Sequence, residues 1–205
     1  MPPRVLITAF EPYGAWPENS SLRCLAELQQ QLDREPVPGI TFETRIYPVD
    51  FAQVRQRLVE DLAQGFDYSL HLGQSPGAGS ILLEEVAINR GMTPGHEGCQ
   101  HLEPDAPVAY SSTLPLEDWA HELLQAGLPV RVSYHAGTYL CNATLYWSLH
   151  LAYRNGWPTR SVFIHLPFDV SQALAQNKDV ASLPSQVTAQ AVRWILAKLA
   201  ELPGL

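Results

Sequence analysis

The chain has 205 residues, of which 46% are hydrophobic and 17% charged, and its formal net charge at pH 7 is −8. This length and composition are typical of a globular protein with one sizeable core, so we expect a single domain over residues 1–205. The 13 Lys and Arg residues form no basic run, which argues against nucleic acid or an anionic membrane as a partner.

Membrane insertion and export are not indicated either. No segment approaches the roughly 18 apolar residues of a membrane span, and the apolar stretch at residues 5–10 is too short for a signal peptide. The cysteines Cys24, Cys99 and Cys141 are odd in number and lack C-x-x-C spacing, so neither a disulfide framework nor a zinc site is indicated. We therefore expect a cytoplasmic protein with free thiols.

Apolar runs and helical periodicities alternate along the first part of the chain. Residues 4–10 form a continuous apolar run, which is typical of a strand buried on both faces of a parallel sheet. The elements expected next are a helix capped by Ser20 or Ser21 and ending near residue 32, a strand over 40–49, a helix capped by Asp50 over about 51–64, and a strand over 68–73. This alternation predicts a three-layer α/β/α fold around a mostly parallel, twisted central sheet.

The second part of the chain continues the pattern around an irregular segment. Residues 91–107 are rich in Gly, Pro, His and acidic residues without periodicity, so they are a candidate lid or contact loop. The elements expected around this loop are a strand over 80–89, a helix over 116–125, a strand over 129–133, a helix from about 141 to 155, a strand over 161–166 and a helix over about 185–202.

Two weaker motifs in this part of the chain have simple interpretations. Residues 73–79 form a Gly-rich loop, but no Gly-Lys-Ser/Thr is present and a strand is expected next, so a turn facing the substrate is favoured over a nucleotide site. His96, Glu97 and His101 lie close in the sequence, but no second ligand pair follows at a fixed spacing, so no metal site is expected.

Cys141 stands where a strand turns through Gly137 into a helix. The first amides of a helix have no intrahelical partner and carry the positive end of its dipole, so a sulfur there is held partly as thiolate. The same amides can hold an oxyanion. The alternative is a buried structural thiol, since free cysteines often pack as small hydrophobic side chains. The choice depends on whether the chain supplies a base.

His165 and two glutamates are the candidates to complete such a site. In open α/β sheets ligands lie outside the carboxyl ends of the strands, and His165 lies near the end of an apolar strand, where it is either a core residue or the general base for Cys141. Glu84 and Glu85 are adjacent within another apolar strand and point to opposite faces, so one of them can be inward and then needs a partner. The residues alone do not choose between them.

Five segments resemble, in the same order, motifs of the type I pyroglutamyl peptidases, also called pyrrolidone-carboxylate peptidases. Residues 10–14, Phe-Glu-Pro-Tyr-Gly, resemble F-E-P-F-G, and residues 71–74, His-Leu-Gly-Gln, resemble H-V-G-Q. Residues 84–89, Glu-Glu-Val-Ala-Ile-Asn, resemble E-R-V-A-I-N. Residues 136–142 resemble A-G-T-Y-V-C-N, and residues 163–168 resemble F-I-H-I-P-Y. The resemblance spans nearly the whole chain.

The resemblance implies a cysteine exopeptidase that removes amino-terminal pyroglutamate (5-oxoproline) from peptides through a thioester, without a cofactor. It assigns the nucleophile to Cys141, the base to His165 and the orienting carboxylate to Glu84. It further implies a homo-oligomer, either a tetramer or a dimer. By the same resemblance the lactam-binding residues are Phe10, Tyr13 and Gln74, of which Gln74 would hydrogen-bond the ring amide.

The chain departs from the family pattern in two places. Gly77-Ala78 stands where the family usually has Gly-Arg, and the segment after Asn89 is shorter and lacks an acidic pair and an arginine that helps to stabilise the oxyanion. Arg90 is the candidate substitute for that arginine. Two alternatives to an active peptidase stay open: a catalytically weak or inactive relative that binds a lactam or peptide, and an amidase acting on a different small cyclic amide.

Overall fold

A six-stranded sheet forms the centre of the computed structural model, which describes residues 2–14, 16–92, 97–176 and 179–202. Its strands are β1 (Arg4–Phe10), β2 (Thr41–Tyr47), β3 (Tyr68–Gln74), β4 (Ile81–Glu84), β7 (Val130–Ser133) and β8 (Arg160–Leu166). They lie in the order β2-β1-β3-β8-β4-β7. All neighbouring pairs are parallel except β4 and β8, which are antiparallel, so the mostly parallel sheet expected from the sequence is confirmed.

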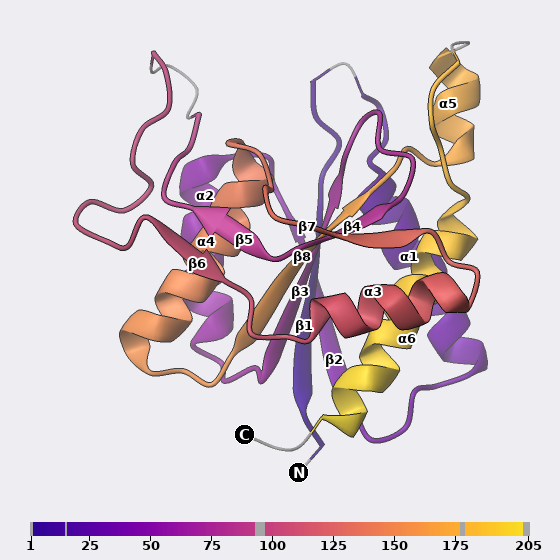
Figure 1. The fold of residues 1–205 in the computed structure, drawn as a ribbon, viewed down its shortest axis with the longest axis horizontal. Coiled ribbons are helices and arrows are strands. Elements are labelled where there is room, and N and C mark those ends of the chain that lie inside the picture. The colour runs from indigo at the N-terminus through magenta and orange to yellow at the C-terminus, as the bar shows by residue number, and fades with distance from the viewer. Residues whose placement is uncertain (1, 15, 93–96, 177–178, 203–205) are drawn as a thin grey trace.

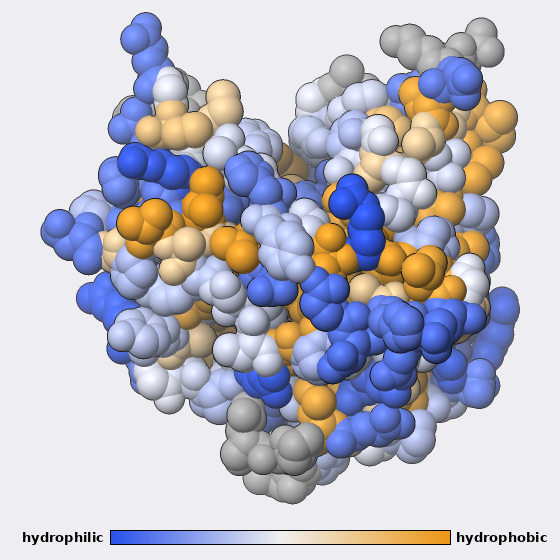
Figure 2. All heavy atoms as spheres, in the orientation of Figure 1, coloured by the Kyte–Doolittle hydropathy of each residue, from blue (hydrophilic) through white to orange (hydrophobic). Residues whose placement is uncertain are grey.

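Helices cover both faces of this sheet (Figure 1). One face carries α1 (Ser20–Arg34), α3 (Leu116–Gln125) and α6 (Ser185–Glu201), and the other carries α2 (Phe51–Leu62) and α4 (Leu140–Asn155). Each face has its own buried core, represented by Leu28 and Val192 on the first and by Leu58 and Tyr146 on the second. Hydrophilic side chains gather over α3 on the face shown in Figure 2, as expected for helices that bury only one side. The three-layer α/β/α architecture is therefore confirmed.

The ends of the helices follow local capping chemistry. Asp50 caps α2 as expected, because its Oδ1 accepts from the amide of Gln53 at 2.8 Å. The cap of α1 is Asn19 and not Ser20 or Ser21, since Oδ1 of Asn19 accepts from the amide of Ser21 at 3.0 Å. Gly156 ends α4 with a left-handed φ of 64°, which glycine adopts without the strain of a side chain.

Three short elements differ from the sequence expectation. A single strand over residues 80–89 is wrong: β4 lies in the central sheet, whereas β5 (Val86–Ile88) pairs antiparallel with β6 (Ala109–Ser111) in a separate two-stranded sheet. Neither β6 nor α5 (Val170–Gln176) was expected. Strands of three residues and a helix of seven are too short for a clear hydrophobic period.

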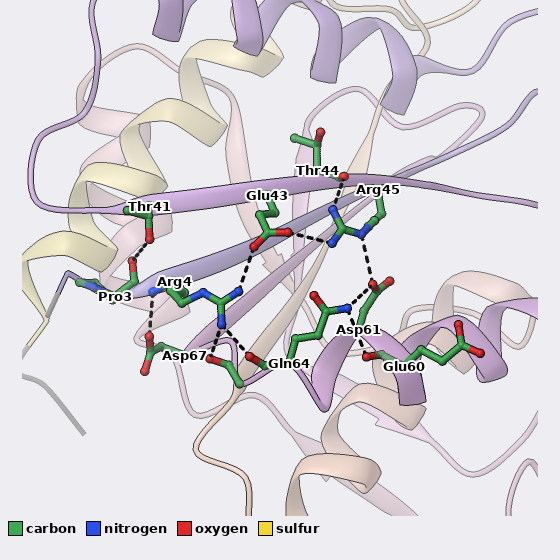
Figure 3. Close-up of polar contacts among 11 residues, drawn as sticks. Pro3, Arg4, Thr41, Glu43, Thr44, Arg45, Glu60, Asp61, Gln64 and Asp67 are labelled. Carbon is green, nitrogen blue, oxygen red and sulfur yellow. Dashed lines mark hydrogen bonds and ion pairs between the residues drawn. The ribbon is translucent and has the colours of Figure 1, made fainter.

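Charged side chains tie the edge strand β2 to β1 and α2 (Figure 3). Glu43 accepts from Arg4 at 2.9 Å and from Arg45 at 2.8 Å, and Arg45 also pairs with Asp61 at 3.1 Å. Partly exposed pairs of this kind contribute little stability each, about 0–1 kcal/mol. Charges on an edge strand do, however, oppose pairing with a foreign strand. Among the described residues, none of the helices has the length and apolarity needed to cross a membrane.

Candidate active site

Cys141 is the second residue of α4, where the sequence predicted that a helix begins. The first hydrogen bond of the helix runs from the amide of Ala143 to the carbonyl of Tyr139 at 3.1 Å. The amides of residues 140–142 therefore come before the first hydrogen bond of the helix. They point out of its amino-terminal end, where Cys141 lies. The half-buried thiol of Cys141 lies at the positive end of the dipole of α4.

His165 and Glu84 meet because β4 runs antiparallel to β8. In this register Glu84 lies opposite Phe163, and His165 lies opposite Leu82, so the side chains of Glu84 and His165 are diagonal neighbours on one face. Oε1 of Glu84 is 2.6 Å from Nδ1 of His165, and Glu84 is only 1% exposed. A carboxylate can only accept, so Nδ1 carries the proton and Nε2 is left for Cys141.

The position at which β4 ends determines which of the two glutamates, Glu84 or Glu85, lies beside His165. Glu84 is the last residue of this strand and is buried, whereas Glu85 lies between β4 and β5 and is half-buried, with its amide donating to the carbonyl of Ser133 at 2.8 Å. The structure therefore pairs Glu84 with His165 and leaves Glu85 outside the cluster.

Charge governs the protonation of His165. Burial by itself lowers the pKa of this imidazole, but the charge and hydrogen bonding of Cys141, followed by those of Glu84, outweigh burial and raise the pKa to about 10. A raised pKa means that the protonated form of His165, the imidazolium, is stabilised by its surroundings in the site.

Gly73 allows the reacting groups to approach the sheet. This residue lies opposite His165 in the pairing of β3 with β8. A Cβ atom at position 73 would lie 2.4 Å from the Phe163 ring and 3.3 Å from Sγ of Cys141. In the sequence Gly73 is only one residue of a motif. The structure shows why a side chain would not fit at this position.

A pocket opens beside Cys141 at the carboxyl end of the parallel strands. Phe10, Tyr13 and Gln74, the expected lactam-binding residues, all line it. The space between its walls is about 310 Å³, part of which is open to solvent. Its remaining walls, which the sequence did not single out, are Asn19, Val49, Gly73, Tyr139 and Leu140. Asn19 and Val49 follow the ends of β1 and β2, so the rule that ligands lie at strand ends could have found them.

Tyr13 and Gln74 are two of the polar residues that line this pocket. Burial, and next the charge of Cys141, raise the pKa of Tyr13, against an opposing effect of the Gln74 side chain, so this phenol stays neutral. Gln74 is 5% exposed, and its Oε1 accepts from the amide of Ser20 at 3.0 Å. Its Nε2 is buried and has no hydrogen-bond partner in the part of the chain that the structure describes.

Asn142, the residue after Cys141, connects α4 to the last residue of β5 and to Arg90 just beyond it. Its Nδ2 donates to the carbonyls of Ile88 at 2.9 Å and Arg90 at 2.8 Å, and its Oδ1 accepts from the amide of Ile88 at 2.9 Å. The main chain of Arg90 therefore lies beside the beginning of α4, and Arg90 as a whole is exposed to solvent. Ala78 is half-buried in the turn after β3 and is not among the pocket-lining residues.

Metal-binding side chains do not cluster in the described ranges, where no group of three or more His, Cys, Asp or Glu residues could hold an ion. Glu97 and His101 of the irregular loop are exposed, and His96 lies outside the described residues. Met92 connects this loop to the stretch before Cys141, since its amide donates to the carbonyl of Thr138 at 2.7 Å. The interpretation of residues 91–107 as a lid or contact loop stays a prediction.

A cysteine at a helix start beside a histidine–carboxylate pair is the arrangement found in cysteine hydrolases. The sequence profile of the family described as pyroglutamyl peptidase matches residues 3–201 of the chain. The chain belongs to this family and is a peptidase of the hydrolase class.

Individual relatives agree with this assignment. The pyrrolidone-carboxylate peptidase of Chromobacterium violaceum is 38% identical over 83% of this chain and 80% of that protein. The corresponding peptidase of Pyrococcus furiosus is 34% identical over 83% of this chain and 84% of that protein. The crystal structure of pyrrolidone carboxyl peptidase from Fervidobacterium islandicum superposes with a TM-score of 0.88 at 32% identity, covering 97% of this chain and 99% of that chain.

Proposed function

We propose that the chain removes amino-terminal pyroglutamate from peptides by covalent catalysis at Cys141. The observation that carries this proposal is the 2.6 Å contact between Glu84 and His165, together with the influence of Cys141 on the pKa of that histidine. The thiolate of Cys141 attacks the pyroglutamyl carbonyl, and the proton held by His165 passes to the departing amine. Water, deprotonated by His165, then hydrolyses the thioester and releases pyroglutamate and the free thiolate.

Each member of the triad has a separate task in this scheme. Cys141 forms the new carbon–sulfur bond, and His165 moves the proton between nucleophile, leaving group and water. Glu84 fixes the tautomer of His165 and stabilises its charged form, and it does not itself take up the proton. The amides at the beginning of α4 are the candidate donors to the oxyanion, because they lie beside Cys141 and lack intrahelical partners.

The pocket beside Cys141 supports a neutral five-membered lactam as the group it binds. Phe10 supplies an apolar wall, and Tyr13 and Gln74 supply polar side chains. The unpartnered Nε2 of Gln74 is a donor suited to the ring carbonyl. No described Asp or Glu lines this pocket to pair with a charged amino terminus, and an uncharged ring costs less to bury than an ammonium group.

The departures at Ala78 and Arg90 favour a second candidate, a relative that binds a lactam or peptide with little or no turnover. Removal of one oxyanion donor lowers the rate of acyl transfer on the order of a hundredfold or more. Because Arg90 is exposed and Ala78 is uncharged, oxyanion stabilisation would rest mainly on the amides of α4. The third candidate, an amidase for another small cyclic amide, keeps the same triad.

Release of a chromophore from a pyroglutamyl amide separates these candidates. We expect the wild-type chain to hydrolyse it and Cys141→Ala to be inactive. Equal rates in the two proteins, or no release by either, would contradict the proposed peptidase. Binding of pyroglutamate without turnover, with no reaction of Cys141 toward a pyroglutamyl chloromethyl ketone, would favour the second candidate, and turnover of other cyclic amides alone would favour the third. The expected homo-oligomer and the single-domain organisation stay predictions, which light scattering and limited proteolysis can test.

A further inference from the structure

The amide of Gln74 is held in one orientation by groups behind the pocket. Its Oε1 accepts from the main-chain amide of Ser20 at 3.0 Å and from Nε2 of Gln172 at 2.7 Å. A main-chain N–H can only donate, so the atom that faces Ser20 must be the oxygen of Gln74. The nitrogen of Gln74 consequently points the other way.

Gln172, in α5, is itself oriented by two main-chain groups. Its Oε1 accepts from the amide of Asp169 at 2.9 Å, and its Nε2 donates to the carbonyl of Glu18 at 3.1 Å. These main-chain partners have fixed polarity, so Gln172 presents a donor to Gln74 and not an acceptor. Gln172 is 6% exposed, so water does not readily replace these contacts.

The result of this chain of hydrogen bonds is a buried donor without a protein partner. Nε2 of Gln74 makes no hydrogen bond of normal distance and angle to a described residue, although the Gln74 side chain is close enough to the phenol of Tyr13 to lower its pKa. Leaving a buried N–H unpaired is unfavourable, and the imbalance disappears when a ligand supplies an acceptor. The pocket is thus organised for a ligand with a carbonyl at this point.

We propose that Gln172 is a positioning residue for substrate specificity: it holds Gln74 with its N–H toward the pocket and thereby selects a ring that bears a carbonyl. The inference rests on the proposed function, in which the lactam occupies the pocket beside Cys141. An amino-terminal proline has the same ring size but no ring carbonyl, so it leaves Nε2 of Gln74 unpaired and is rejected. Sites that hydrogen-bond a substrate group discriminate strongly against analogues that lack it.

Gln172→Glu tests this role, and Gln176→Glu on the same helix is the matched control. The carboxylate at position 172 cannot donate to Oε1 of Gln74, so it repels that oxygen and favours rotation of the amide. We expect KM for a pyroglutamyl amide to rise about tenfold or more, while kcat changes by less than about threefold, because the lost contact is made equally in the bound substrate and the transition state. Among the described residues Gln176 shares no hydrogen bond with Gln74, so Gln176→Glu should keep the wild-type KM.

Two ring inhibitors distinguish a rotated amide from a distorted pocket. In Gln172→Glu, inhibition by 2-pyrrolidone, which carries the ring carbonyl, should weaken about tenfold, whereas inhibition by cyclopentanecarboxamide, whose ring has none, should change less than about twofold. A distorted pocket weakens both inhibitors alike, and that result would overturn the proposal. A folded variant with an unchanged KM, or with a loss confined to kcat, would overturn it as well.

The failure of this inference and that of the proposed function are distinct. If wild-type protein releases no chromophore from the pyroglutamyl amide, the proposed function fails before any variant is compared. If wild-type protein is active and the variant behaves like it, only the role of Gln172 is wrong. Should thermal melting show that Gln172→Glu is unfolded, Gln172→Met, which has similar length and no donor, is expected to raise KM about fivefold, and an unchanged KM there counts against the proposal.

Discussion

Oε1 of Glu84 lies 2.6 Å from Nδ1 of His165 across a separation of 81 residues in the sequence. The contact depends on the one antiparallel pairing of the central sheet, in which β4 brings Glu84 alongside Phe163 and diagonal to His165. Both partners are largely buried, so the hydrogen bond is shielded from water and the carboxylate acts strongly on the imidazole.

Glu84→Gln is expected to lower kcat by about 10²- to 10⁴-fold with little change in the fold. The amide keeps a hydrogen-bonding group beside Nδ1 of His165 but removes the negative charge that helps to raise the pKa of the histidine. The pKa of His165 therefore falls, and the alkaline limb of the pH–rate profile moves to lower pH. Steady-state kinetics on a pyroglutamyl amide between about pH 5 and 10 measure both effects.

Glu85→Gln is the matched control for this experiment. It makes the same chemical change one residue along the chain, at a half-buried position outside the Glu84–His165 pair. Its kcat and pH profile should stay close to those of the wild type. If Glu85→Gln lost activity and Glu84→Gln did not, the carboxylate of the triad would have been misassigned.

Cys141→Ala should lower the pKa of His165 by about one unit or more. The charge and hydrogen bonding of Cys141 are the largest effects that raise this pKa from its ordinary value of 6.5 to about 10, and alanine removes both. Proton NMR of the imidazole as a function of pH measures the change directly. An unaltered titration of His165 in the variant would mean that thiolate and imidazolium do not interact.

The same shift sets a pH window for stability. A pKa raised from 6.5 to about 10 means that protonation of His165 favours the folded state. This contribution is fully present below about pH 6.5 and is lost as the pH rises through about 10. In Cys141→Ala the pKa of His165 is lower, so this contribution to stability is lost completely at a lower pH. Chemical denaturation of both proteins at pH 7, 8 and 9 measures the difference.

Gly73→Ala is expected to lower kcat at least tenfold and to lower the free energy of unfolding by about 1–3 kcal/mol. The added methyl group would lie 2.4 Å from the Phe163 ring and 3.3 Å from Sγ of Cys141, so one of these groups must move. Gly79→Ala is a suitable comparison, because a Cβ there meets no atom within 4 Å and should leave both quantities near wild type. Wild-type kinetics in Gly73→Ala would show that the site tolerates a displaced nucleophile.

The sequence predicted the layers of the fold because its long elements carry strong periodic signals. The helix over residues 116–125 matches α3 residue for residue, and the buried run at 4–10 matches β1. The short elements failed for the opposite reason: β5, β6 and α5 contain too few residues to bury a recognisable face. The direction of β4 in the sheet could not be predicted either, because nothing in its residues indicates that it runs antiparallel to β8.

The same limit explains what the sequence could say about the site. The position of Cys141 at a helix start follows from local patterns and is confirmed by α4. The preference for Glu84 over Glu85 came from family resemblance alone, because it depends on where β4 ends and how it pairs. Gln172 was missed because its importance lies in contacts with Gln74 and Ser20, which are 98 and 152 residues away.

His71 provides a test of stability that is independent of catalysis. It is completely buried under the site: its Nδ1 shares a hydrogen bond with Thr8 Oγ1 at 2.8 Å, and its Nε2 shares one with Ser148 Oγ at 2.8 Å. Burial lowers the pKa of His71 from 6.5 to about 3, so the imidazole is neutral in the folded state at neutral pH. It joins β1, β3 and α4, the helix that carries Cys141, through uncharged contacts.

Acid should therefore destabilise the wild type through His71. Between about pH 6.5 and 3 the unfolded chain binds a proton at this residue and the folded chain does not, so the free energy of unfolding falls by about 1.4 kcal/mol per pH unit from this group. His71→Gln has no titrating group at this position, so its free energy of unfolding should fall less between pH 7 and 5, as measured by urea denaturation. At pH 7 the variant should be less stable than the wild type, because glutamine packs imperfectly in the space of the imidazole. His121→Gln, at an exposed position in α3, should keep the wild-type slope. Equal slopes for wild type and His71→Gln would mean that His71 is not the buried neutral group that couples folding to pH.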